Sequence, residues 1–135
     1  HNPERKRLVE LKTNRNLRET VWLPEFEGRV SFVEQYRYVT QAALYCEIER
    51  RASGRPEGEW LDFYMVAVSK EKVPDKEIID LRDPDRYVVE IERIERNMPR
   101  ILQVKAGTLE PFRCERCDYC RSTRKLTGAI HYTEL

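Results

Sequence analysis

The segment "WLDFYMVAVS" at residues 60–69 restricts the fold most strongly, because nearly every side chain in it is apolar or aromatic. A strand with one solvated face alternates between apolar and polar residues, whereas a strand covered on both faces reads as a continuous apolar run. We therefore expect residues 60–69 to form the central strand of a sheet. The turn residues "KVPD" follow, and "KEIIDL" at 76–81 predicts a short neighbouring strand.

The rest of the pattern predicts helices before and after this strand pair. Apolar residues recur at helical spacing from about Val30 to Arg51, and a second helix is expected to start at Asp83-Pro84 and end near Gly107. The other expected elements are a strand over 7–12, a loop or short helical turn over 13–29, and a short helix around 118–126. This order of elements predicts an α/β or α+β core.

Composition is that of a soluble globular protein. The chain has 135 residues, 36% of them charged and 40% hydrophobic, so one domain over residues 1–135 is expected. No apolar run approaches the ~18 residues of a membrane-spanning helix, and no signal peptide is visible. Asn2-Pro3 is typical of a turn, so we expect the strand at 7–12 to be the second arm of a hairpin whose first arm lies before His1.

The strand over 7–12 carries a glutamate and a lysine at alternate positions, Glu10 and Lys12. Alternation places both on one face and Val9 and Leu11 on the other. Metal-dependent hydrolysis of a phosphodiester needs carboxylates that hold Mg²⁺ and a group that orients water or stabilises charge on the phosphate. The pair meets these needs, although a strand with one solvated face shows the same pattern, and so short a motif also arises by chance.

The first predicted helix contains "QAALY", in which Gln41 and Tyr45 share a face because they lie four residues apart. Arg37, four residues before Gln41, extends this row. A guanidinium, an amide and a phenol in line predict a ridge that faces phosphate groups. An ordinary amphipathic helix with Tyr45 half in the core is the alternative.

The third feature is "CERCDYC", in which Cys114, Cys117 and Cys120 are spaced three apart. Such crowding favours metal or cluster ligation over disulfides, and a zinc site or an iron–sulfur cluster takes four ligands. The fourth would come from Cys46, from His131 or from a cysteine before His1, while a reduced, metal-free turn remains the alternative. Arg121, Arg124 and Lys125 make the same segment basic, as suits a polyanionic substrate or a solvated turn.

Together these stretches resemble the PD-(D/E)xK nuclease superfamily, and within it the phage and prophage exodeoxyribonuclease branch of the RecE (exonuclease VIII) and lambda-exonuclease types. "VELKT" matches the acid-x-Lys motif and "QAALY" the Q-x-x-x-Y helix. "DFYMVAVSKEKVPDKEIIDL" resembles the strand pair that follows, and "RCERCDYCRSTRKL" the cysteine-bearing tail. The resemblance covers nearly the whole chain, with the motifs in the family's order.

The resemblance implies a restriction-endonuclease-like core, with a small mixed sheet flanked by helices and a Cys-rich loop and short helix over 111–126. It implies a Mg²⁺-dependent (or Mn²⁺-dependent) DNA exonuclease acting in phage or prophage recombination or repair. Glu10 and the backbone carbonyl of Leu11 would be metal ligands, and Lys12 would position water and steady the phosphate. Gln41 and Tyr45 would orient the site and contact DNA. The cysteines would bind an iron–sulfur cluster or zinc, and Arg37, Arg121, Arg124 and Lys125 would contact DNA.

The family's other metal-binding acid, the Asp of its PD motif, belongs to a strand before the acid-x-Lys strand. It is therefore expected before His1, and this chain would be the C-terminal part of a nuclease core with an incomplete metal site. Two alternatives stay open: a non-catalytic nucleic-acid-binding module with a cysteine-bound metal, and a degenerate nuclease fold that serves as an assembly subunit. Expected partners are DNA, a second copy of the chain and a recombination protein, in a bacterial or phage-encoded cytoplasmic protein without membrane contact.

Overall fold

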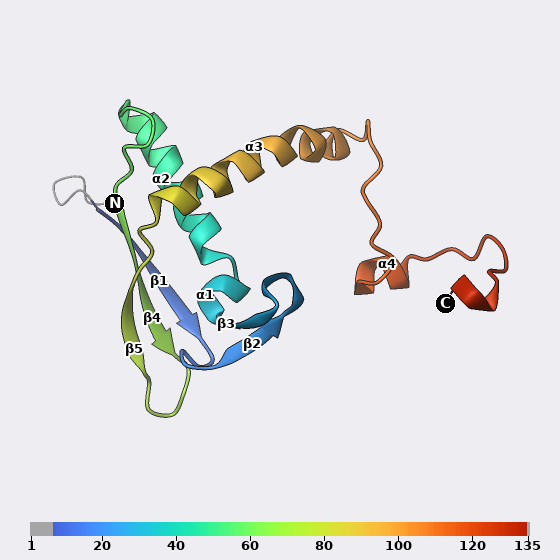
Figure 1. Cartoon of the computed structure of the whole chain (residues 1–135), viewed down its shortest axis with the longest axis horizontal. Coiled ribbons are helices and arrows are strands. Elements are labelled where there is room, and N and C mark those ends of the chain that lie inside the picture. Colours follow the sequence, from blue (N-terminus) through green and yellow to red (C-terminus); the bar gives the residue numbers. More distant parts are fainter. Residues whose placement is uncertain (1–6, 135) are drawn as a thin grey trace. The chain divides into compact units, whose positions relative to one another are not determined.

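The computed structural model of the protein describes residues 7–134 (Figure 1). The chain divides into two compact units, His1–Asn97 and Met98–Leu135. Strands β1 to β5 belong to the first unit, and the three cysteines of "CERCDYC" belong to the second. The single domain predicted over residues 1–135 stays a prediction.

Three strands form the main sheet, in the order β1–β4–β5. Their bounds are Arg7–Asn14 for β1, Asp62–Ser69 for β4 and Lys76–Asp80 for β5. The central strand, β4, pairs in parallel with β1 and antiparallel with β5. The predicted opening, central and neighbouring strands are therefore confirmed, as is the mixed α+β class.

Helix α2 (Tyr38–Ser53) covers the inner face of this sheet (Figure 1). Phe63, Met65 and Ala67 of β4 are buried because alternate side chains of a strand share a face. The helix meets them with small side chains that allow a close approach of helix and sheet. These residues belong to one core cluster, and the helical members are Ala42, Ala43 and Cys46.

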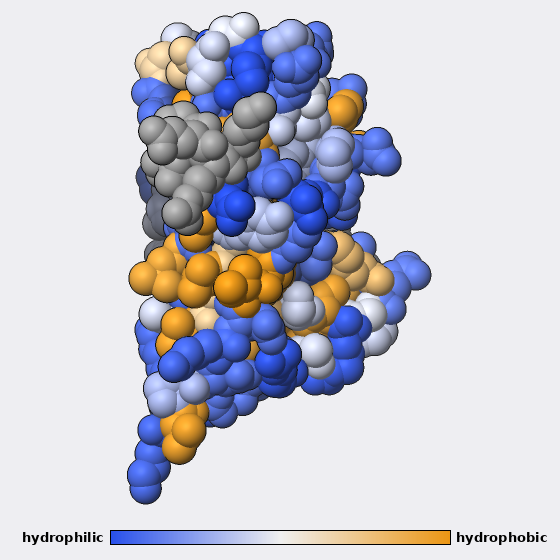
Figure 2. Space-filling model, turned by 90° about the vertical axis from the view of Figure 1, so that its left-hand side faces the viewer, coloured by the Kyte–Doolittle hydropathy of each residue, from blue (hydrophilic) through white to orange (hydrophobic). Residues whose placement is uncertain are grey.

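The polarity of β1 is the reverse of that of an ordinary amphipathic strand. Its register places Glu10 beside Met65 and Lys12 beside Ala67, so the charged pair lies on the inner, helix-covered face. Val9 and Leu11 lie on the other face and are 56% and 67% exposed. Ile78 of β5 shares this outer face and is also exposed. Figure 2 shows apolar side chains gathered on the side of the molecule that lies at the left in Figure 1.

The loop or short helical turn predicted over 13–29 is correct for a short turn there but missed the two strands of a second sheet. Strands β2 (Thr20–Leu23) and β3 (Gly28–Ser31) pair antiparallel around a short 3₁₀ turn, η2 (Pro24–Phe26). Glu27 closes the turn in the left-handed region with φ 47°. Strands of four residues show only two inward side chains each, which is too short an alternation to stand out in a sequence.

The helix predicted over 30–51 is wrong at its start. Residues 30 and 31 complete β3, and the helical part is divided into α1 (Phe32–Gln35) and α2 (Tyr38–Ser53). Arg37 separates the helices, because its φ of 55° is left-handed and cannot continue a right-handed helix. The end of α2 has the usual chemistry, with a left-handed glycine, Gly54, as its C-cap.

Helix α3 (Pro84–Lys105) confirms the second predicted helix. Its first turns hold it to the core of the first unit through Tyr87, which is 2% exposed and donates a hydrogen bond of 2.6 Å to the carbonyl of Leu81. The ring of Trp60 packs edge-on against Tyr87, with 5.5 Å between ring centroids. No helix within residues 7–134 is long and apolar enough to cross a membrane.

The second unit contains α4 (Asp118–Ser122) and a 3₁₀ turn, η3 (Tyr132–Glu134). The short helix predicted over 118–126 is wrong at its end, since it stops at Ser122. The hydroxyls of Ser122 and Thr123 both donate to the carbonyl of Tyr119, at 3.1 and 2.6 Å. Such local side-chain bonds compete with continuation of the helix.

Glu47, near the middle of α2, is a buried carboxylate that is only 7% exposed. It accepts hydrogen bonds from Arg50 at 2.7 and 2.8 Å, from Arg51 at 2.6 Å and from the indole of Trp60 at 2.9 Å. The hydrogen bonds from Arg50 outweigh the cost of burial and lower the pKa of Glu47 to about 2. The charged form is thus fully satisfied, as a buried charge requires.

We predict that acid destabilises the protein through this group. A pKa lowered by folding stabilises the native state above the unfolded pKa of about 4.3, and this stabilisation is lost as the pH falls toward the folded value of about 2. Glu47→Gln should therefore reduce the loss of unfolding free energy between these limits, by up to about 3 kcal/mol. Urea denaturation at a series of pH values measures it. Glu92→Gln, at an exposed position of α3, should leave the slope unchanged, and an equal slope in the two variants would contradict the prediction.

Candidate functional site

The charged pair of β1 forms the centre of the candidate site. The Nζ atom of Lys12 lies 2.8 Å from Oε1 of Glu10, and the two side chains are 22% and 28% exposed. The hydrogen bond to Glu10 raises the pKa of Lys12 above its usual value, against an opposing effect of burial. Lys12 is thus an ammonium at neutral pH and is suited to stabilise negative charge beside the strand.

Helix α2 faces this pair with a row of polar aromatic and amide side chains. The amide nitrogen of Gln41 donates a hydrogen bond of 2.7 Å to the phenol oxygen of Tyr45. The Tyr45 ring lies against Phe63 of β4, with 6.4 Å between the ring centroids. Tyr45 is 40% exposed. The sequence prediction that Gln41 and Tyr45 share a face is confirmed.

Tyr38 of α2 contacts Lys12 of β1, although it was not predicted from the sequence as a site residue. The Lys12 ammonium lies 5.0 Å from the centroid of the Tyr38 ring, within the range of a cation–π contact. Tyr38 stands three residues before Gln41 and seven before Tyr45, so the helical period places all of them on one face. The signal was present in the spacing, but the predicted row was started at Arg37 instead.

Arg37 does not extend the row, and the sequence prediction is wrong on this point. Because its backbone is left-handed, its side chain leaves the helix face and pairs with Glu25, with 2.6 Å between Nη2 and Oε1. Its guanidinium also lies over the ring of Phe26, 5.1 Å from the centroid. Arg37 therefore fastens the η2 turn of the β2–β3 hairpin to the start of α2. Its predicted contact with DNA stays a prediction.

The residues around Glu10 are suited to form part of a magnesium site. Within residues 7–134, no group of three His, Cys, Asp or Glu ligands converges there. Mg²⁺ commonly takes one or two protein carboxylates and completes its coordination with water and substrate phosphate oxygens. One carboxylate, Glu10, beside an ammonium and two phenols is therefore consistent with a partial site of this kind.

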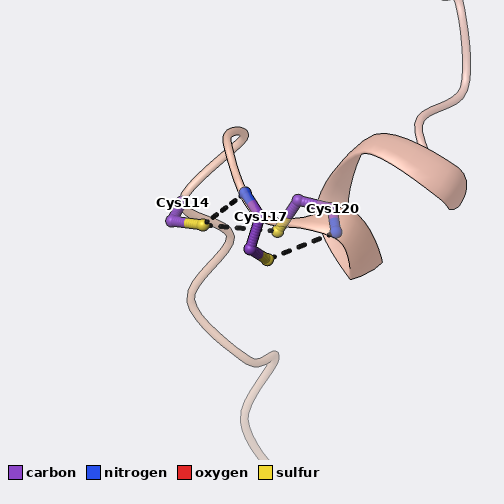
Figure 3. A group of neighbouring side chains, drawn as sticks. All are labelled: Cys114, Cys117 and Cys120. Carbon is purple, nitrogen blue, oxygen red and sulfur yellow. Dashed lines mark hydrogen bonds between the residues drawn. The ribbon is translucent and has the colours of Figure 1, made fainter.

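The cysteines form a second candidate site in the other unit (Figure 3). The Sγ atoms of Cys114, Cys117 and Cys120 lie within 4.8 Å of one another, and those of Cys114 and Cys120 are 3.9 Å apart. A tetrahedral zinc site with Zn–S bonds of about 2.3 Å separates its sulfurs by about 3.8 Å. The donor set and its spacing therefore fit a thiolate-bound metal.

Local backbone groups favour the charged form of one of these thiols. Hydrogen bonds from the N–H groups of Arg116 and Cys117 lower the pKa of Cys114 to about 7. The N–H of Cys120 lowers the pKa of Cys117, but the bonds with the sulfurs of Cys114 and Cys120, together with burial, outweigh it and raise the pKa. The lowered pKa of Cys114 favours its thiolate, which is the form that binds a metal.

Cys46 is not suited to be the fourth ligand. It is fully buried in the core of the first unit, and its Sγ donates to the carbonyl of Leu61 at 3.5 Å. Burial raises the pKa of this thiol to about 11. His131 is not within reach of the triad, since the group of converging ligands found among the described residues ends at three. The fourth ligand therefore stays a prediction.

The predicted basic residues beside the cysteines differ in their surroundings. Arg121 and Lys125 are exposed. Arg124 pairs with Glu115 at 3.3 Å, and Glu115 also binds Arg113 at 3.1 Å. Part of the positive charge is thus neutralised within the segment. The contacts of Arg121, Arg124 and Lys125 with DNA stay predictions.

A mixed sheet with an acid-x-Lys strand, covered by a helix that carries Q-x-x-x-Y, defines the class of PD-(D/E)xK nucleases. The chain belongs to the family described as PDDEXK-like domain of unknown function (DUF3799), whose model matches residues 1–123. The superfamily resemblance seen in the sequence is therefore confirmed. No curated protein matches the chain.

A solved structure supports the same assignment. It is the crystal structure of a protein from Eubacterium rectale, described as a candidate exonuclease, and it matches with 36% sequence identity and a TM-score of 0.76. The match covers 95% of this chain and 46% of that chain. The chain thus spans about half the length of this neighbour.

We predict that the left-handed backbone at Arg37 matters more for stability than its charge. Arg37→Gly removes an exposed ion pair, worth about 0–1 kcal/mol, but relieves the cost of φ 55°, so the unfolding free energy should change little. Arg37→Val keeps neither the pair nor a tolerated conformation and should cost about 1–3 kcal/mol. Urea denaturation compares the two. If Arg37→Gly cost as much as Arg37→Val, the left-handed backbone would not be the dominant element, since both variants lack the ion pair.

Proposed function

We propose that this chain is the part of a Mg²⁺-dependent DNA exonuclease that carries the acid-x-Lys half of its active site. The observation that carries the proposal is the placement of Glu10 and Lys12 on the inner face of β1, beside Tyr38, Gln41 and Tyr45 of α2. An ion pair on the covered face of a sheet has a desolvation cost that the same pair facing solvent does not have, so its placement favours a functional role. Membership of a PDDEXK-like family supports the same chemistry.

Each residue has a role that its chemistry allows. Glu10 and the carbonyl of Leu11 would hold Mg²⁺ together with an acid from the sequence before His1, and Mn²⁺ suits the same oxygen ligands. The bound metal supplies Lewis-acid stabilisation of the phosphate and a more acidic water. Lys12, as an ammonium, donates to the phosphate or to the attacking water. Gln41 and Tyr45 donate hydrogen bonds that orient the DNA backbone.

The wider assignment is part of the proposal. The order of the motifs supports the RecE-like exonuclease branch and a role in phage or prophage recombination, with attack on a DNA end. The neighbour described as a candidate exonuclease is consistent with this assignment. The cysteine triad would hold a metal that stabilises the tail, and a cysteine before His1 would complete its ligands.

A nucleic-acid-binding module without catalysis is the second candidate. It is favoured by the presence of one carboxylate, rather than two, among the described residues beside Lys12. In that case DNA would bind to the same row of side chains and would remain intact with any divalent ion.

We predict that the protein including the sequence before His1 degrades linear DNA with Mg²⁺, and that Lys12→Ala lowers the rate. A preorganised group that stabilises developing charge contributes about 10²–10³-fold, so a loss of this order is expected. Single-turnover degradation of a labelled duplex measures it. Lys72→Ala, at an exposed position in the β4–β5 turn, is the matched control. Binding without degradation in the wild-type protein would favour the non-catalytic module.

We predict that the cysteine triad accounts for bound metal. Cys117→Ala should abolish stoichiometric zinc or iron in the purified protein, because it removes one of three converging thiols. Elemental analysis and the visible absorption spectrum identify the metal, since an iron–sulfur cluster is coloured and zinc is not. Cys46→Ala, in the core, should retain the full metal content. Loss of metal in the Cys46 variant, or retention in the Cys117 variant, would contradict the assignment.

A further inference from the structure

We propose that Tyr38 is a positioning residue, which holds the Lys12 ammonium in place through the face of its ring. The role of Tyr38 in cleavage rests on the proposed nuclease function, whereas its contact with Lys12 does not depend on that function. The distance of 5.0 Å between Nζ and the ring centroid is within the ≈ 6 Å range of a cation–π contact. Lys12 therefore has two partners within the described residues, the Glu10 carboxylate and the Tyr38 ring.

The two partners differ in what happens to them when a ligand binds. A carboxylate that coordinates a metal shares its oxygens with that metal, so Glu10 would hold Lys12 less strongly in the loaded site. The face of an aromatic ring has no competing ligand of this kind. Tyr38 can thus keep the long, flexible lysine side chain oriented when the ion pair with Glu10 weakens, which lowers the entropy that Lys12 loses on meeting a phosphate.

The ring of Tyr38 is itself held on more than one side. Phe32 packs edge-on against it, with 6.2 Å between centroids and an interplanar angle of 75°. Tyr36 lies at 5.8 Å, tilted by 39°. Phe32 is 4% exposed and belongs to the core, so it provides a fixed support. A supported ring is what a positioning residue requires, because its own movement would transfer to the lysine.

The backbone around Tyr38 is fixed as well. The left-handed Arg37, tied to Glu25 and Phe26, ends α1 and starts α2, so that Tyr38 is the first residue of α2. A continuous helix through this junction would carry Tyr38 to another angle relative to β1. The interruption therefore sets the direction in which the ring approaches Lys12, and it gives the hairpin a role in the site.

The decisive experiment varies the ring electrons and keeps the ring shape. Tyr38→Phe removes only the hydroxyl, and trifluorinated phenylalanine at the same position weakens the negative ring face at nearly constant volume. We expect Tyr38→Phe to cleave DNA within about threefold of the wild type. The trifluorinated ring should cleave about tenfold more slowly than Phe, which corresponds to about 1.4 kcal/mol at 1.36 kcal/mol per tenfold change. DNA affinity, measured with Ca²⁺ in place of Mg²⁺, should stay within about twofold, since the proposed effect is on orientation.

Tyr64 offers a matched control on the opposite face of the sheet. Its ring lies 5.4 Å from the guanidinium of Arg82, so the same fluorination weakens a cation–π contact that does not involve Lys12. Cleavage should be unchanged by fluorination at Tyr64. Equal losses at both positions, or no loss at Tyr38, would overturn the proposal. A Tyr38→Phe variant as slow as the trifluorinated one would assign the effect to the hydroxyl and overturn it too.

A second measurement does not need activity. Side-chain ¹³C labelling of lysine should show the Lys12 methylene resonances shifted upfield by the Tyr38 ring current, with Lys12→Arg identifying the signal. Tyr38→Leu should abolish this shift and Tyr38→Phe should keep it. If the wild-type protein cuts no DNA, the nuclease proposal fails, and the ring-current shift alone decides whether the ring holds the lysine. A wild-type spectrum without the shift would disprove the contact.

Discussion

The parallel pairing of β1 with β4 is the constraint on which the rest of the site depends. Its register sets Glu10 beside Met65 and Lys12 beside Ala67, so the charged pair is held on the face that α2 covers. Because side chains alternate along a strand, a shift of one residue would move both charges to the outer face and bring Val9 and Leu11 inward. The observed register instead leaves Val9 and Leu11 exposed and holds the Glu10–Lys12 pair on the covered face, which is the arrangement that the proposed site requires.

The same register explains the exposed apolar surface of the sheet. Leu11, Val66 and Ile78 are neighbours across the three strands on the outer face, and Leu11 and Ile78 are 67% and 70% exposed. Parallel strands normally have both faces covered. The continuous apolar character of "DFYMVAVS" thus reflects one face packed by α2 and one face whose apolar side chains are open in the described residues. The inner face of the sheet therefore contains both the core residues of β4 and the candidate site residues of β1.

The sequence predicted the parts of the fold whose patterns are long or chemically distinctive. The apolar run of β4, the Asp83-Pro84 start of α3 and the shared face of Gln41 and Tyr45 all follow from periodicity or capping. It failed where tertiary contacts override a local pattern. Nothing in the residue type of Arg37 indicates a left-handed backbone, which is maintained by Glu25, Phe26 and the hairpin. The helical spacing could have placed Tyr38 on the face of Gln41 and Tyr45, but not beside Lys12, which lies 26 residues earlier and is brought to Tyr38 by the register of β1.

The two candidate sites are built on different physical principles. The site at Lys12 is assembled from distant segments, which an ion pair and an aromatic contact join. The cysteine triad is local, largely exposed and held by weak hydrogen bonds to sulfur. A metal bound by converging thiolates couples its binding to local folding, so the proposed metal would stabilise this segment. The N–H groups of Arg116 and Cys117 lower the pKa of Cys114, so the local backbone already favours one thiolate, which is the form that would bind a metal.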